Sequence, residues 1–276
     1  MSKSADREVV VAAVQMDVIQ GLPARNSAVM AERLSAAAES GARLVVFPEC
    51  AHNGYVFGGA GEARDAAAPP GHGWMRHLEA ACAAHDVWVV AGFLERFDDR
   101  LHNSAAVIGP SGLLGIYRKT HLPLLGVDRY VHAGEEIPVF DLPFCRLGVL
   151  ICYDIRFPEA CRTLALKGAD VLAVPTNWHQ GAESAPEFLT RTRAWENRIW
   201  VVACNRVGTE RGVRFIGRSQ IVSPAGRVLA EAGGNEPETI AAAIVPAEAR
   251  CKRLVVAPGE FEMDPIGDRR PEIYTV

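Results

Sequence analysis

Short apolar runs alternate with amphipathic stretches along most of this chain. Residues 8–16 form an apolar, valine-rich run that is too short for a helix and is typical of a buried strand. Apolar residues then recur at helical spacing over 30–41, and a second strand is predicted over 43–47. The same patterns predict strands over 87–94, 137–141, 147–151, 170–175, 199–204 and 239–245, helices over 74–86, 158–168 and 187–198, and hairpins over 102–119 and 217–232. This alternation predicts an α/β fold with mixed sheets covered by helices.

Three segments break this pattern. Residues 50–73 are rich in glycine and proline and predict a long loop, a kind of segment that often carries function. Residues 122–136 are irregular. From 252 onward the chain is polar without clear periodicity, which predicts an arm on the surface or on a partner subunit, or else a frayed tail. No linker divides the chain, so we expect one domain over 1–276 with 252–276 as a C-terminal arm.

Composition narrows the class of protein. The chain has 276 residues, is 49% hydrophobic and carries a formal net charge of -4, which fits a globular protein with a large core. Without a polycationic surface, nucleic acid and anionic membranes are poor partners, and a small neutral or weakly charged molecule fits better.

The termini and cysteines indicate a compartment. The first ten residues lack the apolar core of a signal peptide, and no apolar run approaches the ~20 residues that span a membrane. The seven cysteines are odd in number and never form a CxxC pair, which argues against a disulfide framework or a zinc knuckle. We therefore expect a cytoplasmic protein.

Three predicted strands end on residues of complementary chemistry, namely Glu49, Lys119 and Cys152. A cysteine with its ordinary pKa of ~8.5 is mostly protonated at neutral pH and needs a base or a nearby cation before it attacks. Glu49 can be that base, and Lys119 can hold the negative oxygen of a tetrahedral intermediate together with the backbone N–H of Tyr153. Spacing alone leaves open that Glu49 and Lys119 are merely solvated and that Cys152 is an inert core thiol.

The sequence around these residues resembles the nitrilase superfamily of carbon-nitrogen hydrolases. The resemblance rests on VVFPE at 45–49, YRKTHLP at 117–123 and LGVLICYDIRFPEA at 147–160. Weaker blocks extend it over nearly the whole chain: GADVLAVPTNW at 168–178, RTRAWENRIWVVACNRVG at 191–208 and GRSQIVSPAGRVL at 217–229. Several ordered blocks are far more specific than one motif.

The resemblance implies a four-layer α-β-β-α sandwich that commonly dimerises through its helices and uses neither a metal nor an organic cofactor. It implies that Glu49 is the general base and later the acid that protonates ammonia. By the same match, Lys119 belongs to the oxyanion site and Cys152 forms a covalent thioester that water hydrolyses.

One family feature differs in this chain. Many members place a second glutamate after the lysine block, where it positions substrate and the lysine. Here Asp128 is the carboxylate that follows Lys119 most closely, and it is one methylene shorter. We predict that Asp128 takes this role, with Glu135 or Glu136 as the alternative.

Other candidates concern the substrate pocket. Tyr55, Asn177 and Trp178 match family segments that line the substrate, although a packed aromatic ring and a turn with a buried indole explain them equally well. We interpret the remaining polar residues near these blocks as structural: Arg156 and Glu159 as a structural pair or helix-start charge, Glu196 and Asn197 as scaffold, and His52, His121 and His179 as hydrogen-bonding loop residues rather than metal ligands.

Three classes of function remain in competition. The leading prediction is an amidase that converts a small aliphatic amide, omega-amide or carbamoyl compound to the acid and ammonia. Nitrile hydrolysis is the nearest alternative, but nitrile-cleaving relatives usually carry a tryptophan-glutamate pair after the nucleophile, where this chain has Tyr153 and Asp154. The others are a cysteine-histidine acyltransferase or peptidase and a binding protein without turnover. The sequence does not identify the substrate.

Overall fold

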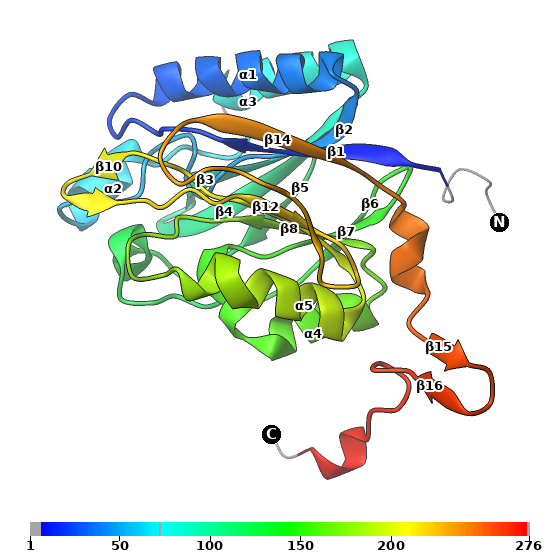
Figure 1. The fold of residues 1–276 in the computed structure, drawn as a ribbon. Coiled ribbons are helices and arrows are strands. Elements are labelled where there is room, and N and C mark those ends of the chain that lie inside the picture. Colours follow the sequence, from blue (N-terminus) through cyan, green and yellow to red (C-terminus); the bar gives the residue numbers. More distant parts are fainter. Residues whose placement is uncertain (1–6, 72, 275–276) are drawn as a thin grey trace.

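Two β-sheets lie face to face in the computed structural model, with helices on both outer faces (Figure 1). The structure describes residues 7–71 and 73–274. Most of the segment on which the expectation of no signal peptide rests, and the last two residues of the predicted arm, lie outside this range. The layers follow the order helix, sheet, sheet, helix, which confirms the predicted α-β-β-α sandwich.

The first sheet has six strands in the order β14-β1-β2-β3-β4-β5. Strands β1, β2 and β3 are parallel, whereas β14, β4 and β5 join antiparallel. Helices α1 and α3 cover its outer face (Figure 1). The bounds are β1 Val9–Gln15, β2 Ala42–Val46, β3 Trp88–Phe97, β4 Arg100–Gly109, β5 Gly112–Arg118, β14 Glu238–Ile244, α1 Pro23–Glu39 and α3 Gly73–His85.

The second sheet has six strands in the order β13-β12-β9-β8-β7-β6, with helices α4 and α5 on its outer face. Strands β7, β8 and β9 are parallel, so their carboxyl ends lie at one edge of the sheet. The bounds are β6 Val139–Asp141, β7 Arg146–Val149, β8 Val171–Pro175, β9 Trp200–Cys204, β12 Gln220–Val222, β13 Val228–Glu231, α4 Pro158–Leu166 and α5 Thr190–Asn197. Two small pairs stand apart: β10 Thr209–Glu210 with β11 Val213–Arg214, and β15 Leu254–Ala257 with β16 Phe261–Met263.

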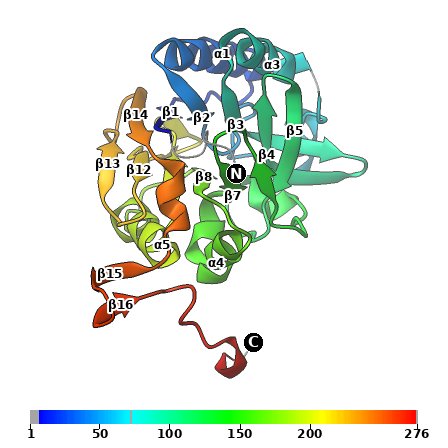
Figure 2. The same cartoon turned by 90° about the vertical axis from the view of Figure 1, so that its right-hand side faces the viewer.

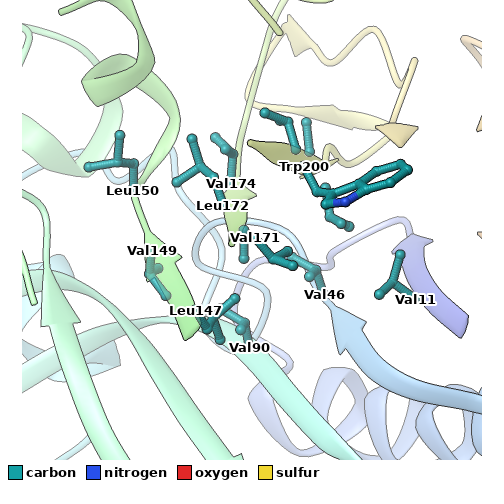
Figure 3. Packing of buried hydrophobic residues seen from close by; sticks show 14 of the residues in the cluster. Val11, Val46, Val90, Leu147, Val149, Leu150, Val171, Leu172, Val174 and Trp200 are labelled. Carbon is teal, nitrogen blue, oxygen red and sulfur yellow. The ribbon is translucent and has the colours of Figure 1, made fainter. Parts of the chain in front are cut away.

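Side-chain alternation explains why the sheets stack. In β1, Val11 and Ala13 face the second sheet, whereas Ala12 and Val14 face the helices. Side chains from both sheets, such as Val90 and Leu147, gather in one cluster between them (Figure 3). Full burial of a valine or leucine side chain contributes about 1.5–3 kcal/mol, so this layer holds the strand ends rigidly in register.

The structure differs from the sequence prediction in the segments with weak periodicity. The loop predicted over 50–73 contains a short helix, α2 Ala60–Ala66, whose start is stabilised by Glu62 accepting the Gly58 N–H at 2.7 Å. The arm contains the β15–β16 hairpin, which both views show lying away from the sandwich (Figures 1 and 2). Both elements are short and largely exposed, so they lack the alternating burial that reveals a strand or helix.

The strand before Cys152 ends earlier than predicted, at Val149. The N–H of Ile151 donates to Asp154 Oδ2 at 2.9 Å instead of joining the ladder. The chain therefore turns at Cys152, and the cysteine lies on a turn beyond the strand. None of the helices in the described part of the chain is long and apolar enough to cross a membrane.

Candidate active site

Three segments that leave the two sheets carry Glu49, Lys119 and Cys152 to one place. Glu49 follows β2, Lys119 directly follows β5, and Cys152 opens the 3-10 turn η2 Cys152–Arg156 after β7. Glu49 is fully buried and Lys119 is 1% exposed. Both charged side chains act electrostatically on the Cys152 thiol. The structure thus brings together the three groups that the sequence singled out.

Lys119 is the centre of a buried charge cluster. Its Nζ lies 2.8 Å from Glu49 Oε1 and 2.6 Å from Asp128 Oδ2. Burial lowers the pKa of Lys119, but attraction to Glu49 and Asp128 outweighs burial, so this pKa lies well above its usual range. Lys119 is therefore an ammonium ion at neutral pH, the form that can bind a negative oxygen.

Asp128 reaches Lys119 because its turn packs closely on an aromatic ring. The turn is η1 Gly126–Tyr130, where Gly126 has φ +46° and a Cβ would lie 2.1 Å from the Tyr55 ring. Glycine alone permits both that backbone conformation and that approach. Tyr55 OH donates to Asp128 Oδ2 at 2.9 Å. The close turn thus compensates for the missing methylene.

The alternative carboxylates lie elsewhere. Glu135 and Glu136 line a separate surface groove of about 720 Å³ with Phe97, Arg100 and Arg118. They are therefore not the partners of Lys119.

Asn103, a residue that the sequence analysis did not single out, joins the two carboxylates. Its Nδ2 donates to Glu49 Oε1 at 2.7 Å and to Asp128 Oδ1 at 2.8 Å, and its side chain is fully buried. The available signal was a polar pair, Asn103 and Ser104, inside the predicted 102–119 hairpin, because polar side chains in a buried strand need partners.

Cys152 occupies a constrained turn. Its φ of +46° lies in the left-handed region, which costs a non-glycine residue about 1–3 kcal/mol and persists when neighbours fix it. The fully buried Asp154 fixes it by accepting hydrogen bonds from Ile151 N at 2.9 Å, Tyr117 OH at 2.8 Å and His121 N at 2.9 Å. Asp154 therefore joins the Cys152 turn to the segment that follows Lys119.

The pKa values of the cluster define the resting state. Burial, and next the negative charge of Glu49, raise the pKa of Cys152 to about 12, although Lys119, the Thr176 hydroxyl and the Asn177 N–H oppose the rise. Burial also raises the pKa of Glu49 above its usual value, against the attraction of Lys119. At neutral pH Cys152 is therefore a thiol.

A cavity of about 50 Å³ opens beside Cys152. Its lining includes all four residues predicted for the pocket: Tyr55, Tyr153, Asn177 and Trp178. The Asn177 side chain is 2% exposed, and neither of its polar atoms has a hydrogen-bond partner within the described residues. Pockets for drug-sized ligands have volumes of ~300–1,000 Å³, so this cavity is suited to a short substrate.

Other polar residues differ in their relation to the cavity. Arg156, interpreted from sequence as structural, is exposed and lines its mouth, as does His179. His121 Nδ1 lies 2.7 Å from Asp154 Oδ1, and His52 Nδ1 lies 2.8 Å from the Ser27 hydroxyl. Across the described residues, no three His, Cys, Asp or Glu side chains are placed to share a metal ion.

This arrangement can be compared with known families. A family model described as carbon-nitrogen hydrolase matches residues 10–253. The chain belongs to the carbon-nitrogen hydrolase family. It is therefore a hydrolase that acts on non-peptide C–N bonds, and the resemblance to the nitrilase superfamily is confirmed. The match ends near the start of the C-terminal arm.

Relatives of this carbon-nitrogen hydrolase include amidases and a nitrilase. A protein named nitrilase from Pyrococcus abyssi is 40% identical, with 96% of this chain and 99% of the relative covered. A 2-oxoglutaramate amidase from Bacillus subtilis is 34% identical, with 82% and 87% covered. Among solved structures, an amidase from Nesterenkonia sp. AN1 superposes with a TM-score of 0.79 at 25% identity, covering 98% of this chain and 96% of that one. That structure shows covalent addition of the acetamide moiety of fluoroacetamide at the active-site cysteine.

Two buried arginines that sequence reasoning did not single out hold the hydrolase site in place. Arg193 in α5 donates to the carbonyl oxygens of Ile155 and Arg156 at 2.8 Å and 3.0 Å, which fixes the turn that begins at Cys152. Arg206 pairs with Glu210 at 3.1 Å. Glu210 Oε2 in turn accepts the backbone N–H groups of Tyr55 and Val56 at 2.9 Å and 2.7 Å. Apart from the Arg206–Glu210 pair, these contacts join residues far apart in sequence.

Proposed function

We propose that this enzyme is an amidase that hydrolyses a small amide, omega-amide or carbamoyl compound to the carboxylic acid and ammonia through a thioester on Cys152. One observation carries the proposal: the Lys119 ammonium lies between Glu49 and Asp128 in a buried cluster, and the charges of Lys119 and Glu49 act electrostatically on the Cys152 thiol. A carboxylate, a cation and a thiol in this relation supply a base, an oxyanion partner and a nucleophile.

The first half-reaction transfers the acyl group to sulfur. Cys152 Sγ attacks the amide carbon while its proton passes to Glu49, and the carbonyl electron pair moves onto oxygen beside Lys119 and the Tyr153 N–H. The tetrahedral intermediate collapses as the C–N bond breaks. Glu49 returns the proton to the leaving nitrogen, and ammonia departs from a thioester.

The second half-reaction restores the enzyme. A water molecule attacks the thioester carbon, and Glu49 takes a proton from that water. Collapse of this second intermediate breaks the C–S bond and releases the carboxylic acid, and the sulfur regains its proton. Asp128 holds Lys119 in place through both half-reactions.

Amides are preferred over nitriles in this proposal. The position where nitrile-cleaving relatives carry glutamate is Asp154 here, and its carboxylate accepts hydrogen bonds from Ile151, Tyr117 and His121. Because these hydrogen bonds hold the Asp154 carboxylate in a structural role, it is not available to react with a nitrile.

A substrate panel tests the activity. Ammonia release is measured for short amides, omega-amides and N-carbamoyl compounds and for the matching nitriles, with the Cys152→Ala variant as the blank. We expect release from at least one amide or carbamoyl class and none from the blank. Release from nitriles alone would contradict the proposal.

We propose that the chain is one catalytic domain whose 252–276 arm helps to form a homodimer. Exposed apolar side chains lie on the α4–α5 layer, at Phe188 and Trp195, and on the arm, at Val256 and Phe261. Grouped apolar exposure of this kind marks protein interfaces. A second copy of the chain, packed helix layer to helix layer, would cover both sets.

We further propose a cytoplasmic location. The seven cysteines are all free thiols, which suits a reducing compartment. Fractionation of source cells should recover the activity with cytosolic markers, and recovery in the culture medium would contradict this assignment.

A further inference from the structure

Asn103 contacts every charged member of the catalytic cluster. It lies near the middle of β4, and its side-chain amide bridges Glu49 Oε1 and Asp128 Oδ1 at 2.7 Å and 2.8 Å. Its backbone carbonyl accepts the Lys119 N–H at 2.8 Å, which fixes the start of the lysine segment. One residue thus sets the positions of three.

The orientation of the Asn103 amide follows from chemistry. Ionised carboxylates only accept hydrogen bonds, so the NH2 group must face Glu49 and Asp128. The amide oxygen then points the other way and accepts the Cys50 Sγ–H at 3.6 Å. Both ends of the amide are satisfied in this orientation alone.

The two oxygens of Glu49 consequently differ. Oε1 accepts from Lys119 Nζ at 2.8 Å and from Asn103 Nδ2 at 2.7 Å, so its lone pairs are engaged. Oε2 is buried and has no hydrogen-bond partner within the described residues. An oxygen with free lone pairs accepts a proton without first breaking a hydrogen bond.

We propose that Asn103 is a positioning residue that selects Oε2 of Glu49 as the atom that takes the proton from Cys152. The inference rests on the proposed amidase mechanism and adds the proton path. The S–H bond breaks, its proton joins Oε2, and the sulfur electron pair forms the S–C bond. The same oxygen later gives the proton to the leaving nitrogen.

Asn103 also favours the basic form of Glu49. Burial and the charge of Asp128 raise the pKa of Glu49, whereas Lys119 and, to a smaller extent, the hydrogen bond from Asn103 lower that pKa. Without the amide donor the Glu49 carboxylate would hold its proton to higher pH. The ionisable groups that face or adjoin Glu49 are Lys119, Asp128, Cys152, Cys50 and Tyr55.

The test compares Asn103→Leu, which has similar size and no donor, with Ser104→Ala. Ser104 is the matched control because its buried hydroxyl donates to Glu95 at 2.6 Å, away from the Lys119 cluster. For Asn103→Leu we expect kcat to be about 100-fold lower, because general-base catalysis contributes at least about that factor, with KM little changed. Its acidic limb of kcat/KM should move to higher pH, whereas Ser104→Ala should keep the wild-type limb.

The inference would be overturned if Asn103→Leu had the wild-type kcat. It would also be overturned if kcat fell while the acidic limb of the pH profile of kcat/KM stayed in place. If Asn103→Leu does not fold, Asn103→Thr replaces it, because a hydroxyl can donate to one carboxylate and should give an intermediate shift of the limb. Glu49→Gln separates this inference from the mechanism. Full activity in Glu49→Gln would show that Glu49 is not the general base. If Glu49→Gln is inactive but Asn103→Leu has wild-type activity, only the role of Asn103 is refuted.

Discussion

At the scale of single residues, Asp128 shows how a short carboxylate side chain can reach a buried ammonium group. Its Oδ2 lies 2.6 Å from Lys119 Nζ because Gly126 lets the turn pack on the Tyr55 ring. Tyr55 then donates to the same carboxylate. The position of Asp128 therefore depends on the local backbone as much as on its own length.

Replacing Asp128 tests its role directly. Asp128→Ala leaves Lys119 with Glu49 as its one carboxylate partner, so we expect a loose ammonium and kcat lower by about 100-fold, as when an oxyanion donor is lost. Asp128→Glu serves as the matched variant, since it keeps the charge and should retain more activity. Circular dichroism should show an intact fold in both, and unchanged turnover in Asp128→Ala would remove Asp128 from the site.

At the scale of elements, the C-terminal arm is anchored where it starts and exposed at its hairpin. Lys252 Nζ donates to the Asn197 and Arg198 carbonyl oxygens at 3.0 Å and 2.9 Å, at the carboxyl end of α5, where a cation is favoured. After this anchored start, the β15–β16 hairpin lies away from the sandwich (Figure 2). The proposed dimer uses the exposed apolar side chains of this hairpin as a contact with the second copy.

The oligomeric state tests this use of the arm. Val256→Asp and Phe261→Asp together place charge on the exposed hairpin without touching the core. Sedimentation equilibrium should give twice the chain mass for the wild type and one chain mass for the double variant. Leu22→Asp, an exposed apolar position at the start of α1, is the control and should remain dimeric. A wild type at one chain mass would contradict the proposed dimer.

At the scale of the whole molecule, the features that could be predicted from sequence are those that depend on neighbouring residues along the chain. The strands of the two sheets, the main helices and the positions of Glu49, Lys119 and Cys152 in the segments just after strands follow from short runs of residues. The hydrogen bonds from Asn103 to Glu49 and from the Tyr55 N–H to Glu210 could not be predicted that way, because these residues lie far apart along the chain. The Asn103 amide meets Glu49 across 54 positions, and Glu210 meets Tyr55 across 155. Only the tertiary fold brings such groups together.

The whole arrangement predicts that an acyl group passes through Cys152. The most direct measurement is the intact mass of the protein, quenched in acid during turnover of a short amide or its ester. We expect an added mass equal to the acyl group less the thiol hydrogen that it replaces, located on Cys152 by peptide mapping and absent from Cys152→Ala. Glu49→Gln should give neither the adduct nor turnover with the amide, because the Cys152 proton then lacks its base. Turnover without any adduct, or an adduct that persists in Cys152→Ala, would contradict the mechanism.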